Sequence, residues 1–427
     1  MKIEQLHKLF LEAKSVSTDT RILPLNALFF ALKGVNFNAN DFAHKALDSG
    51  ASYCIIDEAQ DPEDERFILV GNVLKTLQDL ANFHRQYLGI PIVALTGSNG
   101  KTTTKELINA VLSRSYKTHA TQGNYNNHIG VPLTLLQMDQ STEIGVVEMG
   151  ANHAGEIAQL CAVAAPDFGY ITNFGKAHLE GFGSLEGVVK AKSELYDYLK
   201  QTKGTILVNN DDAQQLKQVG AYANTVSFSS LNTSDFAISL EKETPFLCVN
   251  VNRTSIQSQL LGHYNFTNIA SSIAFGLYFK IDINFIRQGI ESYAPKNNRS
   301  QIIKQNSNTI ILDAYNANPS SVEAALKNFK TMEAHQKIVI LGDMFELGSQ
   351  SFEEHQSIID LAQKLEFSQL YLVGRHFFEH HQNYTNIMFF SGLDDIKQHL
   401  EIYPLEEAMI LIKGSRGMTL EALLELF

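Results

Sequence analysis

The chain has 427 residues, of which 44% are hydrophobic and 19% charged, and its formal net charge is -12. This length exceeds one ordinary hydrophobic core, so we expect two to four domains, and the composition excludes a largely disordered protein. The negative charge and the lack of a basic stripe exclude a nucleic-acid-binding platform, so any phosphate site must be local.

Targeting and redox features point to the cytoplasm. No run approaches the roughly 18 apolar residues of a membrane span, and MKIEQLHKLF lacks the apolar core of a signal peptide. We therefore expect a cytoplasmic protein without a membrane partner. Cys54, Cys161 and Cys248 lie far apart among apolar or small residues, which predicts buried free thiols rather than disulfides or metal ligands.

The first stretch, residues 1–91, has a mixed pattern. A short helix precedes a turn-rich segment at 19–34, and alternating strands and helices follow. Apolar residues at helical spacing predict a helix over 72–88. The sequence Gly89-Ile90-Pro91 then interrupts the pattern and predicts a domain boundary.

The second stretch, residues 92–296, opens with IVALTGSNGKTTTKEL, which predicts a strand, a loop and a helix. Short apolar strands that alternate with helices indicate a parallel sheet covered on both faces. From 227 to 261 we expect a small antiparallel excursion, and KNNRS near 295–299 predicts the second boundary. The further predicted strands are 144–149, 168–173 and 204–209.

The third stretch, residues 297–427, again alternates apolar strands with helices, which predicts a second, doubly wound domain. Its predicted strands are 309–315, 337–343, 370–374, 387–390 and 408–414. The predicted fold is therefore α/β with three domains. A small α/β N-terminal domain (1–91) precedes a central phosphate-loop, parallel-sheet ATPase domain (92–296) and a C-terminal Rossmann-like domain (297–427).

The strongest local motif is TGSNGKTT, where a strand leads into a helix. Glycines let backbone N–H groups turn toward phosphate oxygens, the helix N-terminus adds positive potential, and a lysine supplies a mobile charge. The spacing is two residues shorter than the common phosphate loop, and the alternative is a tight turn with a solvated lysine. The predicted nucleotide contacts are Gly97, Ser98, Asn99, Gly100, Lys101, Thr102 and Thr103, with the Thr102 hydroxyl on a magnesium ion.

Three further residues carry weaker indications. Glu148 ends an apolar strand, where a carboxylate can bind the metal of the nucleotide or, alternatively, cap the helix near Ala154. His178 follows another strand end in a glycine-rich loop, and a lone histidine there is more often a structural or surface residue than a ligand. Lys192 lies on a predicted helix and by itself reads as an ordinary solvated lysine.

The ordered set GSNGKTTTKE, NYNNHIGVP, EMGANHAGEI, NFGKAHLEGFGS and AKSEL resembles the Mur ligases, which build the cell-wall peptide of bacteria. The resemblance runs from Ser17 to Met418. YNANPSSVEA, LGDMFELG and KGSRGM are similar to the member that adds D-alanyl-D-alanine to UDP-N-acetylmuramoyl-tripeptide. The resemblance implies an ATP-dependent amide ligase with an acyl-phosphate intermediate.

The resemblance also implies cofactor and catalytic residues. Thr102 and Glu148 would hold one Mg²⁺, while His178 and Lys192, the latter as a carbamylated lysine, would hold a second. Asn268 matches the adenine contact of the family and Asp313 its ribose contact. The implied catalytic residues are Lys101, His178, Lys192 and Arg299, of which Arg299 matches the γ-phosphate arginine.

The same resemblance implies substrate contacts, and for the N-terminal ones the alternative is surface polar residues in a turn-rich loop. One departure concerns GHYNFTN, where Tyr264 stands in place of the usual histidine while Asn265 and Asn268 keep their places. The implied substrate contacts are Thr20, Arg21, Lys33, Asn124, Asn127, Tyr315, Asn316 and Asn318.

Three alternatives stay open at this point. A sister ligase adding a single amino acid would share the ATP motifs, and YNANP counts against it. A phosphate-loop ATPase without ligase activity is the second alternative, and the second acidic strand motif typical of that class is not found in the sequence. A non-catalytic nucleotide-binding partner is the third, and the presence of Lys101, Glu148, His178 and Lys192 together counts against it. The sequence does not distinguish diaminopimelate from lysine as the third residue of the tripeptide. We expect the protein to be a monomer.

Overall fold

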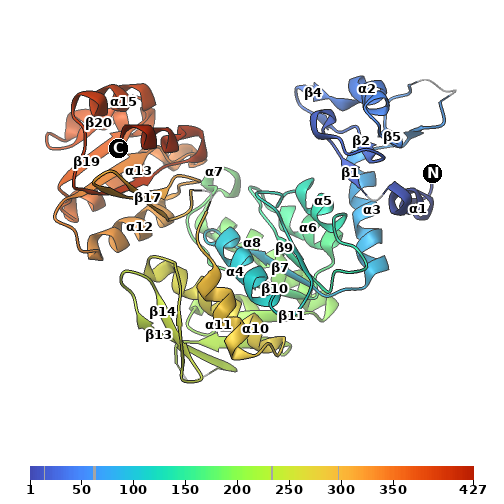
Figure 1. Cartoon of the computed structure of the whole chain (residues 1–427), viewed down its shortest axis with the longest axis horizontal. Helices are drawn as coiled ribbons and strands as arrows, with labels where there is room; N and C mark the ends of the chain where they lie inside the picture. Colours follow the sequence, from blue (N-terminus) through green and yellow to red (C-terminus); the bar gives the residue numbers. More distant parts are fainter. Residues whose placement is uncertain (14, 61–63, 232–233, 297) are drawn as a thin grey trace.

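The computed structural model describes residues 1–13, 15–60, 64–231, 234–296 and 298–427. Figure 1 shows an N-terminal part in blue, a central part in green and yellow, and a C-terminal part in orange and red. The two outer parts lie on opposite sides of the central part. The chain is therefore a mixed α/β protein, as predicted.

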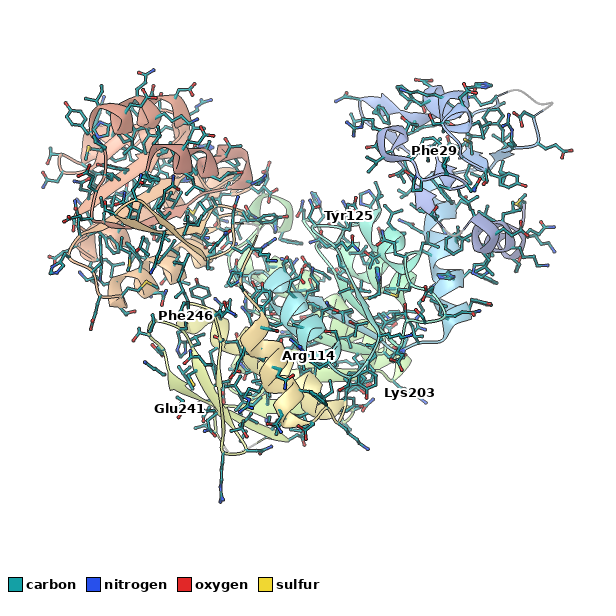
Figure 2. The ribbon with its side chains drawn as sticks, viewed as in Figure 1. Phe29, Arg114, Tyr125, Lys203, Glu241 and Phe246 are labelled. Atoms are coloured by element: carbon teal, nitrogen blue, oxygen red, sulfur yellow. The ribbon has the colours of Figure 1, made fainter. Side chains whose placement is uncertain are left out.

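The N-terminal part is a parallel sheet with its own core. The strand order is β1-β2-β5-β6, and helix α2 (Ala43–Asp48) packs against it. Phe29 is buried in this sheet and is labelled in Figure 2. The strands are β1 (Val16–Ser17), β2 (Leu28–Phe30), β5 (Tyr53–Ile56) and β6 (Phe67–Leu69), beside the hairpin β3 (Lys33–Gly34) and β4 (Phe37–Asn38).

Helix α3 (Val73–Leu88) connects the N-terminal and central parts, which confirms the predicted helix. Asn72 caps it by accepting a hydrogen bond from the Lys75 N–H at 2.7 Å. Its apolar side packs against α1 (Ile3–Ala13), α5 (Gly130–Leu135) and α6 (Glu156–Ala164) in one continuous core. The N-terminal sheet is thus attached to the central part through a shared helix.

The central sheet has the order β15-β14-β13-β12-β11-β10-β7-β9-β8. The strands from β8 to β13 are parallel, and β13, β14 and β15 form the predicted antiparallel excursion. The prediction was wrong in starting that excursion at 227, because β12 pairs with β13 in parallel. The Asp235 carboxylate fixes this pairing by accepting a 2.8 Å hydrogen bond from the Ser227 N–H. The strands are β7 (Ile92–Thr96), β8 (Thr118–Ala120), β9 (Ile144–Glu148), β10 (Phe168–Ile171), β11 (Thr205–Asn209), β12 (Thr225–Ser229), β13 (Phe236–Lys242), β14 (Cys248–Val251) and β15 (Thr254–Gln257).

Helices cover both faces of the central sheet. Along β7, Ile92 and Ala94 enter one core while Val93 and Leu95 enter the other, because successive strand side chains point to opposite faces. A strand buried on both faces must be apolar throughout, which is why the sequence shows a continuous hydrophobic run. The covering helices are α4 (Lys101–Leu112), α10 (Phe266–Tyr278) and α11 (Ile283–Ser292) on one face, and α3, α5, α6, α8 (Leu185–Thr202) and α9 (Ala213–Val219) on the other.

The C-terminal part is a second open sheet of order β16-β17-β21-β18-β19-β20. All its neighbours pair in parallel except β16, an unpredicted antiparallel edge strand. The strands are β16 (Gln301–Gln305), β17 (Asn308–Asp313), β18 (Lys337–Gly342), β19 (Gln369–Val373), β20 (Met388–Phe390) and β21 (Met409–Lys413). Helices α12 (Pro319–Thr331), α13 (Ser351–Lys364) and α14 (Arg375–Phe378) cover one face, and α15 (Leu393–Ile402) and the 3₁₀ segment η7 (Leu420–Leu426) the other.

Cys54, Cys161 and Cys248 are free and buried, as predicted. Among the described residues, no helix combines the length and apolar character that crossing a bilayer requires.

Candidate active site

The loop between β7 and α4 carries the predicted phosphate-binding residues and depends on two glycines. Gly97 has φ 145° and Gly100 has φ 79°, both in the range that glycine adopts without strain. A Cβ atom at Gly97 would lie 2.0 Å from Thr172 Oγ1, and one at Gly100 would lie 2.6 Å from Asn268 Oδ1. Only glycine fits, and the backbone is thereby free to turn N–H groups toward a phosphate.

The residues that follow β10 hold this loop in shape. Thr172 Oγ1 donates a 2.6 Å hydrogen bond to the Asn99 carbonyl, and Asn173 Oδ1 accepts one of 3.1 Å from the Asn99 N–H. The Ser98 hydroxyl donates to the Gly175 carbonyl at 2.8 Å and accepts from the Gly175 N–H at 2.9 Å. The loop is therefore ordered before a nucleotide arrives.

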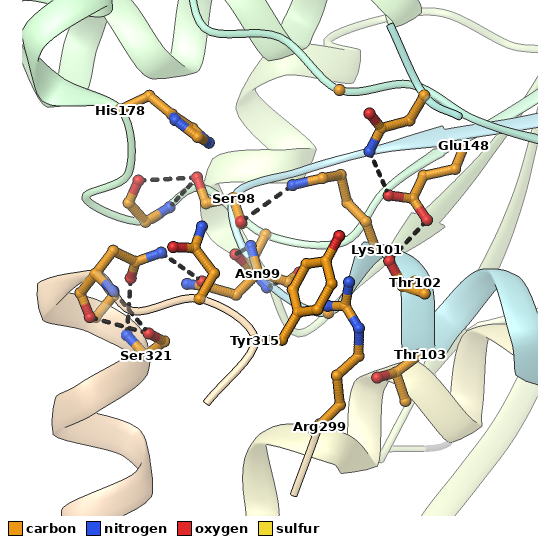
Figure 3. Close-up of a pocket in the computed structure, with 18 of the residues that line it drawn as sticks. Ser98, Asn99, Lys101, Thr102, Thr103, Glu148, His178, Arg299, Tyr315 and Ser321 are labelled. Atoms are coloured by element: carbon orange, nitrogen blue, oxygen red, sulfur yellow. Dashed lines mark hydrogen bonds between the residues drawn. The ribbon is translucent and has the colours of Figure 1, made fainter. Parts of the chain in front are cut away.

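Lys101 folds back onto the carbonyls of its own loop. Its Nζ donates to the carbonyls of Gly97 at 2.7 Å and Ser98 at 3.2 Å. Burial lowers the pKa of Lys101, with Glu148 opposing the shift and Arg299 adding to it. Figure 3 shows Lys101 and Arg299 in the same cleft, so two basic groups from separate segments line it.

Glu148 forms a small polar group with Thr102. Its Oε2 accepts a 2.9 Å hydrogen bond from Thr102 Oγ1, and its Oε1 accepts one of 2.7 Å from Asn126 Nδ2. It does not cap the following helix, since the Glu194 carboxylate accepts from the Gly155 N–H there. A hydroxyl and a carboxylate side by side fit a Mg²⁺ ion that keeps most of its ligands as water and phosphate oxygens.

The C-terminal part supplies the opposite wall of the cleft. The Arg299 guanidinium carbon lies 3.6 Å from the centroid of the Tyr315 ring, a stacked cation–π contact. Asn318 Nδ2 donates a 2.8 Å hydrogen bond to Asn99 Oδ1 of the phosphate loop. Asp313, at the carboxyl end of β17, lines the same wall. Open α/β sheets bind ligands at such strand ends.

Most of the predicted site residues line one cleft of about 760 Å³ between the central and C-terminal parts. Figure 3 shows how side chains from both parts converge on it. The predicted residues that line it are Ser98, Asn99, Gly100, Lys101, Thr102, Thr103, Asn124, Asn127, Glu148, His178, Asn268, Arg299, Asp313, Tyr315, Asn316 and Asn318. Gly97 is not among the lining residues, although its carbonyl binds Lys101.

Lys192 does not line the cleft. Its side chain is fully buried, its Nζ donates to the Ala151 carbonyl at 3.1 Å, and it lies 5.0 Å from the centroid of the Phe182 ring. Burial holds the pKa of Lys192 well below its usual value. His178 lines the cleft, but its Nδ1 pairs with Glu346 of the C-terminal part. The described residues contain no group of three or more His, Cys, Asp or Glu that could hold a metal ion.

Thr20, Arg21 and Lys33, which we call the N-terminal patch, also lie outside this cleft. The Arg21 guanidinium binds Asp19 at 2.6 Å and lowers the pKa of that carboxyl to about 2. Lys33 Nζ binds Asp57 at 2.9 Å. Arg21 and Lys33 are thus paired within the N-terminal part, and the contacts of the patch with a substrate stay a prediction.

The structure brings several further residues to the site that were not predicted from the sequence. Asn126 binds Glu148, and it stands in the quoted NYNNHIGVP between two asparagines that were named. Asn173 follows β10 by two residues and Lys413 ends β21, so the strand-end rule could have found them. Glu346 lies in LGDMFELG and gave no signal of its own, because its pairing with His178 joins distant segments.

Two family descriptions match the chain. "Mur ligase middle domain" matches residues 95–276, and "Mur ligase, glutamate ligase domain" matches residues 298–416. Among curated proteins, the UDP-N-acetylmuramoyl-tripeptide--D-alanyl-D-alanine ligase of Bacillus subtilis is 35% identical, over 96% of this chain and 92% of the relative. The ligase of the same name from Escherichia coli is 31% identical, over 95% and 92%.

Solved structures agree with these relatives. MurF from Acinetobacter baumannii superposes with a TM-score of 0.89 at 28% identity and covers 99% of this chain and 98% of that chain. MurF ligase from Thermotoga maritima in complex with ADP gives a TM-score of 0.85 at 26% identity, over 100% and 98%.

Proposed function

The chain belongs to the Mur ligase family, and on that premise we propose that it joins D-alanyl-D-alanine to UDP-N-acetylmuramoyl-tripeptide at the expense of ATP. Full-length relatives and structural neighbours carrying that name or the name MurF support the assignment. The reaction is an amide-bond ligation in the synthesis of peptidoglycan.

We propose that the domains divide the substrates among them. Residues 1–91 bind the UDP part, 92–296 bind ATP and 297–427 bind the amine. Each stretch contains a sheet of its own, which supports the division. The last boundary falls at Asn297, which lies outside the described residues.

The first chemical step transfers a phosphoryl group. The terminal carboxylate oxygen of the tripeptide attacks the γ-phosphorus of ATP, the bond from that phosphorus to the β–γ bridging oxygen breaks, and ADP leaves. The phosphate loop and Lys101 hold the phosphates, while Arg299 stabilises the charge that builds on the transferring group. Catalysis of this kind is positioning plus electrostatics, without a covalent protein nucleophile.

The second step forms the amide. The uncharged amine of D-alanyl-D-alanine attacks the acyl carbon, a tetrahedral intermediate forms, and phosphate leaves as the amine loses its proton. Tyr315, Asn316 and Asn318 are proposed to line the acceptor side, and Asn124 and Asn127 the side of the tripeptide. Bringing these groups together requires rotation of the C-terminal domain about the segment near Arg299, which small-angle scattering with an ATP analogue and the UDP-substrate would detect.

Magnesium is proposed to accompany the nucleotide. Thr102 and Glu148 would hold one ion, since they already lie within 2.9 Å of each other in the cleft. The ion would neutralise negative charge on the phosphates. Asn126 orients the Glu148 carboxylate through its 2.7 Å hydrogen bond.

We propose His178 and carbamylated Lys192 as ligands of a second ion. An unmodified lysine does not fit that role, because a protonated ammonium repels a cation and has no lone pair to offer. Burial lowers the pKa of Lys192, so its amine is uncharged more readily and is then nucleophilic toward CO₂. The resulting carbamate would present an anionic oxygen. Native mass spectrometry with and without bicarbonate tests the modification.

The remaining assignments concern the adenosine of ATP and the UDP group of the substrate. Asn268 and Asp313 are proposed to contact the adenine and the ribose, and Thr20, Arg21 and Lys33 the UDP group. We further propose that the enzyme works as a monomer in the cytoplasm.

The observation that carries the proposal is the single cleft in which Lys101, Thr102, Arg299 and Tyr315 converge from two domains. Phosphate release from ATP by purified protein tests it. We expect release only with both UDP-tripeptide and D-alanyl-D-alanine. If glycine or D-alanine replaced the dipeptide equally well, the acceptor assignment would fail.

A further inference from the structure

The segment that carries Arg299 from the central to the C-terminal part has an unusual backbone. Asn298 has φ 58° and Ser300 has φ 50°, so non-glycine residues on both sides of Arg299 adopt the left-handed region. This conformation costs free energy for side chains with a Cβ, and it persists only where surrounding contacts impose it. The contacts of this segment therefore determine where Arg299 points.

Both neighbours of Arg299 are held from the C-terminal part. The Ser300 N–H donates a 3.1 Å hydrogen bond to Asp313 Oδ1, and the Tyr315 N–H donates one of 3.2 Å to the Asn298 carbonyl. The Arg299 guanidinium then stacks on the Tyr315 ring. One wall of the cleft thus fixes the segment through its backbone.

Asp313 is itself anchored. Lys413 Nζ, 2% exposed, donates to Asp313 Oδ2 at 2.6 Å and to the Asn316 carbonyl at 3.2 Å. Asp313 and Lys413 are register partners at the ends of the adjacent parallel strands β17 and β21. A partly buried ion pair at two strand ends thus anchors the C-terminal side of the segment.

The central part supplies the other attachment through Tyr264. Its hydroxyl pairs with Ser300 Oγ at 3.0 Å, and its ring lines the cleft beside Asn268. Burial, reinforced by the Asp313 carboxylate, raises the pKa of Tyr264, so the hydroxyl stays protonated. Tyr264 lies in the turn η3 (His263–Asn265), which leads directly into α10, and α10 packs on α4, the helix of the phosphate loop. A chain of contacts therefore connects the phosphate loop to Ser300 in this arrangement of the domains.

We propose that Tyr264 is a positioning residue whose hydroxyl, acting through Ser300, fixes the segment that presents Arg299 to the cleft. Lys413 and Asp313 form the opposing anchor of the same segment. This assignment deepens the proposed function, on which it rests, because it makes the placement of a phosphate-directed arginine depend on a contact between the two domains.

Removing the one hydroxyl tests the proposal with little disturbance of packing. In Tyr264→Phe, kcat for ligation should fall about five- to tenfold, as expected for the loss of one hydrogen bond, while ADP affinity stays within about twofold of wild type. Tyr116→Phe is the matched control, because its hydroxyl donates to the Phe279 carbonyl at 2.9 Å and does not line the cleft. The control should ligate at the wild-type rate.

A double-mutant cycle shows whether Tyr264 acts through Arg299. Once Arg299→Ala has lowered the rate, adding Tyr264→Phe should change it by less than about twofold, since coupled residues give non-additive effects. An equal loss in both backgrounds, no loss in the single variant, or full activity of Arg299→Ala would each overturn the proposal.

Amide hydrogen exchange keeps this test separate from the ligase assignment. The peptide that contains residues 298–300 should exchange about tenfold faster in Tyr264→Phe and at the wild-type rate in Tyr116→Phe. Unchanged exchange overturns the positioning role even if ligation proceeds. Faster exchange without any ligation by the wild type would leave the positioning role standing and remove the proposed function instead.

Discussion

The phosphate loop and the N-terminal patch are both predicted from short stretches of sequence, but they differ in what holds them. The loop is fixed by hydrogen bonds from Thr172, Asn173 and Gly175. In the patch, Arg21 and Lys33 are largely exposed and pair with acidic neighbours of their own domain. The loop is therefore shaped without a ligand, whereas the UDP binding proposed for the patch would exchange existing ion pairs for new ones.

This difference has an energetic consequence. A loop backbone that is already ordered stabilises a charged phosphoryl group at little cost in rearrangement, so under the proposed function its groups should contribute strongly to the reaction. Exposed ion pairs contribute little to stability, and replacing one with a substrate contact yields only a modest net gain. Substitutions in the loop should consequently impair turnover, whereas substitutions in the patch should weaken binding.

The largest expected effect concerns Lys101. Lys101→Ala should lower the rate of ligation about 10³-fold, because it removes the cation that the loop directs at the transferring phosphate. Phosphate release with both substrates present measures the rate. Lys217→Ala, on the exposed side of α9, is the matched lysine control and should keep full activity. Undiminished ligation by Lys101→Ala would place the chemistry elsewhere.

A smaller effect is expected from the backbone of the loop. Gly97→Ala should reduce kcat about 10²-fold, because the added Cβ would lie 2.0 Å from Thr172 Oγ1 and the backbone is at φ 145°. Gly71→Ala is the control, since no atom lies within 4 Å of its added Cβ. Equal activity of the two variants would show that the loop does not need its observed shape.

Part of this site was predictable from the amino-acid sequence. The strand–loop–helix unit is predictable, because glycines and a flanking apolar run determine the loop within a few residues. The predicted strands end up to two residues too late, as in 168–173 against β10 (Phe168–Ile171), since Thr172 and Asn173 leave the sheet to bind the loop. The residue type alone does not show that the chain leaves the sheet at this point.

Contacts between segments far apart in the chain could not be predicted from local sequence patterns. The pairing of Asn318 with Asn99 spans 219 positions, and that of Glu346 with His178 spans 168. The edge strand β16 was missed because its burial is partial and its side chains are mixed. Tyr264 was recognised only as a departure from the family pattern, since its bond to Ser300 depends on how two domains meet.

The N-terminal patch should respond more weakly than the loop. Arg21→Ala and Lys33→Ala should each raise KM for the UDP-substrate about tenfold and leave kcat and KM for ATP unchanged, because a lost ground-state contact affects binding alone. Steady-state kinetics with each substrate varied in turn measures this. A fall in kcat at saturating substrate would show that the patch takes part in the chemistry and would erase the contrast with the loop.

The smallest effect concerns the joint that attaches the N-terminal part to the central part. His7 Nε2 lies 3.0 Å from His84 Nδ1, and His84 Nε2 lies 2.8 Å from the Met138 carbonyl. Burial, with the neighbouring His84, lowers the pKa of His7 to about 4. The unfolded chain, with its histidine pKa near 6.5, therefore binds more protons between these values, and stability is lost as pH falls from 6.5 toward 4.

His7→Gln should consequently reduce the drop in Tm across that pH window by about 3 °C, whereas His335→Gln, an exposed histidine, should leave it unchanged. Equal drops in Tm for both variants would contradict this role for the joint.

The same fall in pH should weaken binding of the UDP-substrate before it weakens binding of ADP, since the joint supports the N-terminal part but does not contact the phosphate loop. Loss of both ligands at one pH would mean that the two regions unfold together.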